Sequence, residues 1–244
     1  NPDDTTAPIM AFDGAVNGMV IRSASAIRAT ILDSDLDQWT LEIAHANSDA
    51  FTVLATGTTP LAPTGTLSTI DPAGLANGFY RLRLTALDVA GRRAVTEAIV
   101  EINSASKMQQ FTRTETDLTV TLDGHVFNLV RQYDSLNASM VNGQSSFGNG
   151  WRLANRDVNL ETNLEPRTSN PEPFRVGTRL YLTLPTGERV GYTFAPVQQT
   201  VNGVTFYTPA FVADSPTIGY QLSTLDAKLS KAGDRLFDFQ TGEA

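Results

Sequence analysis

Apolar and polar residues alternate along most of this chain. In the segment YRLRLTA at residues 80–86, every second residue is apolar, and the residues between them are Arg or Thr. The same alternation recurs at residues 27–31, 39–45 and 98–102. A period of two indicates strands that bury one face, whereas a helical period is almost absent. The pattern therefore predicts an all-β chain.

The first hundred residues have the strand spacing of a β-sandwich, which needs about seven short strands in about 100 residues. The segment LANGFYRLRL at 75–84, followed by DVAG at 88–91, resembles the late strands of immunoglobulin-like and fibronectin-type modules. Tyr80 lies where a tyrosine corner would direct its hydroxyl to the upstream backbone. The opening DTTAP at 4–8 resembles the lead-in of bacterial surface immunoglobulin-like repeats. We expect residues 1–103 to form an immunoglobulin-like sandwich.

The second part of the chain has the pattern of an antiparallel sheet built from hairpins. A polar, small-residue stretch predicts a linker at 104–116, before an Asp123-Gly124 turn between two alternating segments. A second turn is expected at Asn202-Gly203, and a Pro-rich loop at 166–173. Residues 117–244 are expected to form one hairpin-rich β-sheet domain, with further strands near 158–161, 179–184, 189–194, 220–225 and 235–239.

Composition narrows the classes of partner. The net charge of -8 argues against nucleic acid, which requires a basic face, and against anionic membrane surfaces. The absence of cysteine excludes disulfides, thiol nucleophiles and cysteine-ligated zinc. No apolar run approaches the roughly 20 residues that span a bilayer, so we expect no membrane insertion.

One acidic segment has spacing that could serve calcium. Asp33, Asp35 and Asp37 alternate with other residues, and their oxygens could wrap Ca²⁺. An EF-hand is excluded, because its sixth and twelfth positions hold Gln38 and Ala44 in place of Gly and Glu. We favour solvated loop acids and expect no cofactor, while a looser calcium site stays open.

Catalytic signatures are weak. His45 and His125 are isolated, and the chain has neither the G-x-S-x-G nor the H-E-x-x-H pattern. A glycosidase needs two carboxyl groups about 5–10 Å apart across a cleft, and sequence cannot place them. We expect a non-enzyme. The acids that raise the glycosidase question are Glu161, Glu165, Glu172 and Glu188.

The most informative segment is VFNLVRQYDSLNASMVNGQSSFGNGWRL at 126–153. It contains an R-x-Y-D-S-L pattern, a polar loop and an F-G-x-G-W-x-L pattern. This segment resembles the entry segment of bacterial RHS/YD-repeat proteins, in which it opens a large β-shell. The residues that carry the resemblance are Arg131, Tyr133, Asp134, Ser135, Leu136, Phe147, Gly148, Gly150, Trp151 and Leu153.

The resemblance implies a structural lock without chemistry of its own, formed by Arg131, Tyr133, Asp134, Phe147, Gly148, Gly150 and Trp151. We expect Arg131 to pack its stem among aromatic rings and to hydrogen-bond the loop that follows. The glycines would let the backbone turn so that Trp151 enters the core. The alternative is a platform on which Trp and Tyr rings stack against sugars.

The expected function is that of a structural region of a secreted or surface-displayed bacterial protein. It would cap or start an RHS shell around a C-terminal toxin, so that its partners are the shell and cargo of the same, longer polypeptide. The alternative is a surface adhesin or carbohydrate-binding sandwich, with or without calcium, whose ligand is a cell-surface protein or glycan. Exposed Trp39 and Trp151 would favour that alternative, and a hydrolase is the weakest possibility.

Overall fold

The structure is a computed structural model that describes residues 5–139, 147–164, 173–223 and 227–243. It is all-β, as predicted, with strands β1 to β19 and two short 3-10 helices, η1 (Pro72–Gly74) and η2 (Ser135–Ser139). Contacts divide the chain into two compact units, 1–153 and 154–244. Within the described residues, no helix is long and apolar enough to cross a bilayer.

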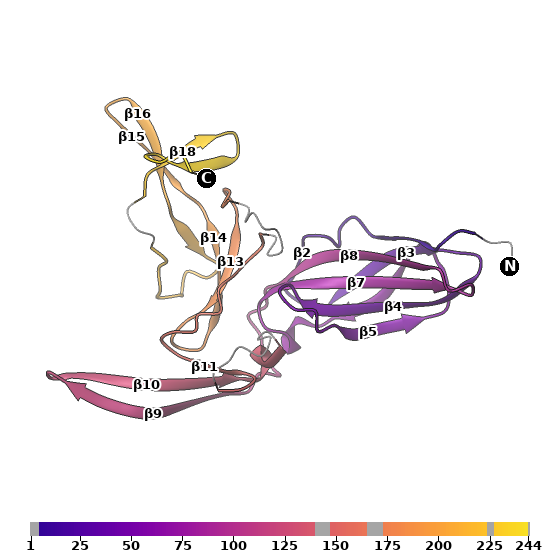
Figure 1. The fold of residues 1–244 in the computed structure, drawn as a ribbon, viewed down its shortest axis with the longest axis horizontal. Helices are drawn as coiled ribbons and strands as arrows, with labels where there is room; N and C mark the ends of the chain where they lie inside the picture. The colour runs from indigo at the N-terminus through magenta and orange to yellow at the C-terminus, as the bar shows by residue number, and fades with distance from the viewer. Residues whose placement is uncertain (1–4, 140–146, 165–172, 224–226, 244) are drawn as a thin grey trace. The chain divides into compact units, whose positions relative to one another are not determined.

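The first hundred residues form the expected sandwich of two sheets (Figure 1). Every pairing is antiparallel except the parallel pair β2–β8. One sheet has the order β1 (Ile9–Phe12), β3 (Ser25–Leu32), β6 (Leu61–Ile70). The other has the order β2 (Met19–Ile21), β8 (Arg93–Ile102), β7 (Gly78–Asp88), β4 (Leu36–His45), β5 (Thr52–Gly57).

The inward side of this alternation forms the core. Leu41, Leu82 and Leu84 have no exposed surface, and Trp39 is buried, with its Nε1 donating to the carbonyl of Thr59 at 3.2 Å. The Tyr80 hydroxyl donates to the carbonyl of Ala76 at 3.0 Å. The predicted tyrosine corner is therefore confirmed.

A three-stranded sheet follows, in the order β11 (Trp151–Leu153), β10 (His125–Asp134), β9 (Thr112–Leu122). The predicted hairpin turn is confirmed: Asp123 and Gly124 have φ angles of 49° and 77°, as a type I′ turn requires. Strand β11 pairs only with Arg131–Tyr133, so the rest of β10 has β9 as its neighbour (Figure 1). Strand β9 begins at Thr112, inside the stretch 104–116 that the sequence assigns to a linker.

The second unit contains two four-stranded sheets. The first has the order β12 (Glu161–Thr162), β13 (Arg179–Thr183), β14 (Arg189–Phe194), β17 (Phe211–Ala213). The second has the order β15 (Val197–Val201), β16 (Val204–Thr208), β18 (Leu229–Ala232), β19 (Arg235–Asp238). Leu180, Leu182 and Tyr192 belong to the core of the first sheet.

Two strand predictions in this unit are wrong. Only Glu161 of the segment 158–161 belongs to a strand, and residues 220–223 form none. The Tyr220 carbonyl instead accepts a hydrogen bond from the Tyr192 hydroxyl at 3.1 Å, so this segment is held by a core side chain rather than by a ladder. Most of the predicted loop at 166–173 lies outside the described residues.

Candidate functional site

The β9–β11 sheet brings several of the predicted lock residues together on one face. Arg131 and Tyr133 alternate along β10 and lie opposite Leu153 and Trp151 of β11. The Tyr133 and Trp151 ring centroids are 5.4 Å apart at 55°. Phe111, which the sequence pattern did not single out, adds a third ring 6.1 Å from that of Tyr133. Tilted rings at these distances stabilise one another beyond the area they bury.

Arg131 stacks among aromatic rings, as expected. The centre of its guanidinium lies 5.0 Å from the Trp151 ring and 5.2 Å from the Phe147 ring, within cation–π range. Its ion-pair partner was not foreseen. Nη2 donates to Oδ1 of Asp117 at 2.7 Å, and Nε donates to the other oxygen of the same carboxylate.

This ion pair joins two strands of the sheet, and the expected hydrogen bond from Arg131 to the loop after β10 stays a prediction. The ladder shifts register next to Leu129, which leaves Asp117 of β9 as the extra residue of a β-bulge. A bulge re-aims the side chain that it carries. The hydrogen bond from Arg131 lowers the pKa of the Asp117 carboxyl and raises that of the guanidinium. Residues 140–146 of the loop lie outside the described residues.

Gly148 and Gly150 lie in the turn that leads the chain into β11, the strand that pairs with β10. Gly148 and Gly150 have φ angles of 92° and 80°, which residues with a Cβ rarely adopt. A Cβ on Gly150 would also lie 2.6 Å from the Tyr133 ring. Trp151 is half-buried, however, and does not enter an enclosed core as expected.

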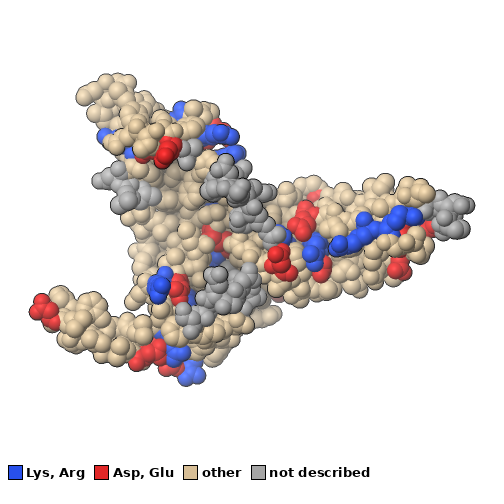
Figure 2. Space-filling model, in the orientation of Figure 1, with Lys and Arg blue, Asp and Glu red and all other residues tan. Residues whose placement is uncertain are grey.

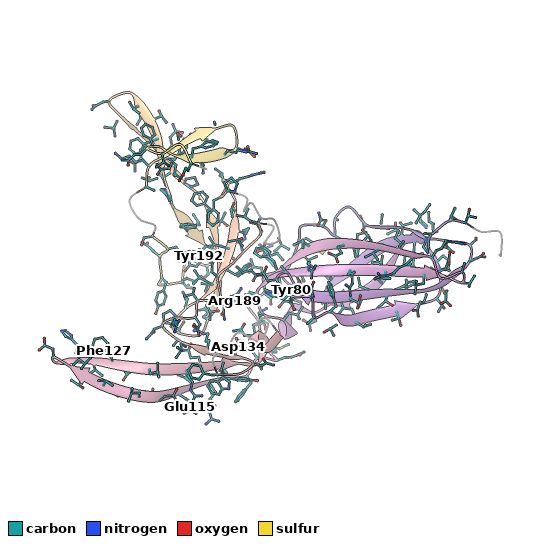
Figure 3. All side chains as sticks on the ribbon, viewed as in Figure 1. Tyr80, Glu115, Phe127, Asp134, Arg189 and Tyr192 are labelled. Atoms are coloured by element: carbon teal, nitrogen blue, oxygen red, sulfur yellow. The ribbon has the colours of Figure 1, made fainter. Side chains whose placement is uncertain are left out.

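Asp134 has a structural role at the base of the hairpin (Figure 3). Its carboxylate is buried and accepts from the Leu136 backbone N–H and from Nε2 of Gln110, each at 2.9 Å. Nearby, Nζ of Lys107 donates to the carbonyls of Pro72 and Leu75. These contacts tie the predicted linker to both its neighbours in sequence.

Burial lowers the pKa of Lys107 to about 8, against the opposing attraction of Asp134 and Asp71. Desolvation disfavours the charged ammonium, and this effect on the pKa is larger than the opposing attraction of the two carboxylates. Lys107 is therefore a half-buried anchor with a lowered pKa, which spacing alone did not reveal.

Sequence reasoning missed a second ion pair of an arginine, which lies in residues 154–244. Nη2 of Arg189 lies 2.6 Å from Glu161, and both side chains are almost fully buried (Figure 3). Glu161 is thus the partner of a cation rather than one of two facing carboxylates. Glu188 is exposed, and Glu165 and Glu172 lie outside the described residues. A separation of 28 residues between the partners gives no signal in the sequence.

The calcium candidates Asp33, Asp35 and Asp37 do not form a group that could hold a metal ion. Oδ1 of Asp33 accepts from the Asp35 backbone N–H at 2.7 Å, a local turn that loop acids commonly form. Among the residues that the structure describes, no group of three His, Cys, Asp or Glu could hold a metal ion around Asp37 or elsewhere. His45 is buried edge-on to Tyr80, and His125 is exposed beside the hairpin turn.

Comparisons with known proteins add little. No protein-family model and no curated protein matches the chain. The endo-beta-1,4-mannanase from Thermotoga petrophila is 12% identical over 42% of this chain and 21% of its own, with a TM-score of 0.32. Murine CRIg is 10% identical over 41% of this chain and 98% of its own, with a TM-score of 0.26.

Dimeric latent PorU from Porphyromonas gingivalis is 16% identical over 93% of this chain and 21% of its own, with a TM-score of 0.32. The chain therefore spans about a fifth of the length of PorU and of the mannanase. Likeness at this level assigns no activity, substrate or partner.

Proposed function

We propose that this chain is a non-catalytic structural region of a secreted or surface RHS/YD-repeat protein. In this role the β9–β11 sheet starts the β-shell that encloses a C-terminal toxin domain. The observation that carries the proposal is an apolar face on the β9–β10 hairpin. On this face Phe127 lies opposite Val120, and Leu129 lies opposite Leu118.

These side chains are exposed to an unusual extent. Phe127 near the turn is 57% exposed, and Leu118, Leu122 and Leu129 are exposed as well (Figure 3). A two-stranded hairpin is marginally stable in water by itself. Contiguous exposed apolar surface commonly marks a contact with another protein segment. The face therefore needs a cover.

The opposite face of the hairpin is different in character. It carries Thr119, opposite Asn128, and Thr121, opposite Val126, and the Thr119 hydroxyl donates to the Asn128 side chain at 2.8 Å. A polar outer face and an apolar inner face are what the wall of a closed β-shell requires. Further β-strands of the same polypeptide are the proposed cover. Five of the residues that match the RHS entry segment lie in the strands of this sheet: Arg131, Tyr133, Asp134, Trp151 and Leu153.

Electron microscopy of the longest native product that contains this segment tests the proposal. We expect a closed, hollow particle. A double variant, Phe127→Asp with Leu129→Asp, should prevent closure. The matched pair Thr119→Asp with Thr121→Asp adds the same charge to the opposite face and should leave the particle closed. A string of separate beads from the parent protein, or closure of the Phe127 variant, would overturn the proposal.

A further inference from the structure

A shallow trough lies on the outer face of the five-stranded sheet of the sandwich. It has a volume of about 230 Å³ and crosses the strands β4, β7 and β8. The register places its lining side chains, together with the neighbouring Val95 and Glu97, in three cross-strand rows. One row holds Glu42, Arg83 and Glu97; the middle row holds Thr40, Thr85 and Val95; the third row holds Gln38, Leu87 and Arg93.

The shape of the trough follows from these rows. Thr40 and Thr85 have short side chains that form a floor, whereas the rows on either side carry long side chains that form walls. The volume is below the roughly 300–1,000 Å³ of sites for drug-sized ligands. The trough is therefore suited to one small ring rather than to a peptide or an extended chain.

The charges of the first row are already paired. Nε of Arg83 donates to Oε2 of Glu42 at 2.9 Å, and its guanidinium lies 3.7 Å from the centre of the Phe51 ring. Glu97 lies 3.6 Å from Nη1 of Arg81. The two carboxylates near the trough thus each have a guanidinium partner, so neither leaves an uncompensated charge against an anionic ligand.

Arg93, at the other end, is different. Its side chain is exposed, and Nη2 makes a single long hydrogen bond of 3.4 Å to the Thr85 hydroxyl. In the described part of the chain it has no ion pair. Figure 2 shows basic side chains in a line over β7 and β8, on a protein whose net charge is -8. The trough therefore has one positive end and one neutralised end.

We propose that this trough binds a single carboxylate-bearing sugar residue, a hexuronate. The guanidinium of Arg93 receives the carboxylate in its planar fork, a geometry that lysine cannot offer. The Gln38 amide and the Thr40 and Thr85 hydroxyls can both donate and accept, as sugar hydroxyls require. A simple anion would leave these three groups without ligand contacts. The site is independent of the shell function proposed above.

A titration of the 244-residue chain with galacturonate, followed by amide chemical shifts, tests the ligand class. Saturable binding is expected, with shifts on β4, β7 and β8. Galactose lacks the carboxylate and therefore loses the charge-assisted hydrogen bonds to Arg93. Acetate lacks the hydroxyls and therefore loses several neutral hydrogen bonds. Each of the two should bind at least about tenfold more weakly than galacturonate. Equal binding of acetate would mean a site for simple anions and would overturn the proposal, as would the absence of galacturonate binding.

Matched variants locate the site. Arg93→Gln should weaken galacturonate binding about tenfold. Arg28→Gln removes an exposed arginine from β3 of the opposite sheet and should leave binding unchanged. Thr85→Tyr should abolish binding by filling the floor while every charge is kept, and an unchanged far-ultraviolet spectrum would show that its fold is intact. Full binding by either trough variant contradicts the assignment.

Discussion

The sandwich and the β9–β10 hairpin have the same alternation of apolar and polar residues but opposite degrees of burial. In the sandwich two sheets face each other, and Leu82 has no exposed surface. In the hairpin the equivalent position Leu129 is 41% exposed. Alternation therefore shows that a strand has an apolar face, but it does not show what covers that face.

The largest expected effect contrasts these two leucines. Leu82→Ala should lower the free energy of unfolding by about 2–5 kcal/mol, since it removes buried methyl groups and leaves a cavity. Leu129→Ala should cost less, about 1 kcal/mol or below, because 41% of the residue surface already faces water. Urea unfolding of both variants measures the contrast. Similar losses would show that the hairpin face is already covered in solution.

The next effect concerns Gly148 and Gly150, in the turn that leads into β11. Gly150→Ala should destabilise the β10–β11 pairing by about 1–3 kcal/mol, because a positive φ is combined with a contact against Tyr133. Gly148→Ala has the positive φ but open space around its Cβ, so its cost should be about 1 kcal/mol.

Hydrogen exchange at the Asp134 and Trp151 amides measures this difference, because these amides donate to the carbonyls of Gly150 and Gly148. The same loss of protection in both variants would show that φ alone sets the cost.

A smaller effect belongs to the sandwich. Tyr80→Phe removes the hydroxyl of the tyrosine corner and should cost about 1 kcal/mol, the net value of a buried hydrogen bond. Tyr220→Phe changes an exposed ring in the other unit and should be neutral within error. Denaturant midpoints give both values. A neutral Tyr80→Phe would mean that water replaces the lost donor at Ala76.

A further effect is a dependence on pH where the predicted linker meets the sandwich. The folded pKa of Lys107, about 8, lies below its ordinary value of 10.5. The unfolded chain therefore holds this proton more tightly, and stability should rise as the pH increases from 8 toward 10.5. Below pH 8 the cost of burying the ammonium is fully present. Lys107→Met should flatten this part of the stability profile, and an unchanged slope would assign it to another group.

Local chemistry made much of the fold predictable. Asp123-Gly124 and Asn202-Gly203 both form the expected turns with positive φ, because these residue types tolerate that backbone at low cost. The tyrosine-corner position of Tyr80 likewise predicted a hydrogen bond from its hydroxyl to the upstream backbone, and the structure shows that the acceptor is the carbonyl of Ala76. Each of these features depends on residues that are close together in the sequence.

Features that depend on distant residues were missed. The pairing of Arg131 with Asp117 depends on a β-bulge, and a bulge has no reliable signature in an alternating sequence. Arg189 and Glu161 come together only because β13 lies between β12 and β14.

The β9–β10 hairpin also affects the order of folding during synthesis. Its pairs spread outward from the cross-strand pair Leu122 and His125 on either side of the turn, so it can form in about 1–10 μs. The sandwich must join residues as distant as Asn17 and Ile99, 82 positions apart, which is intrinsically slower. An early hairpin with an apolar face is an aggregation hazard, and the charged residues at its base, Arg113, Glu115 and Asp117, are placed as gatekeepers against premature association.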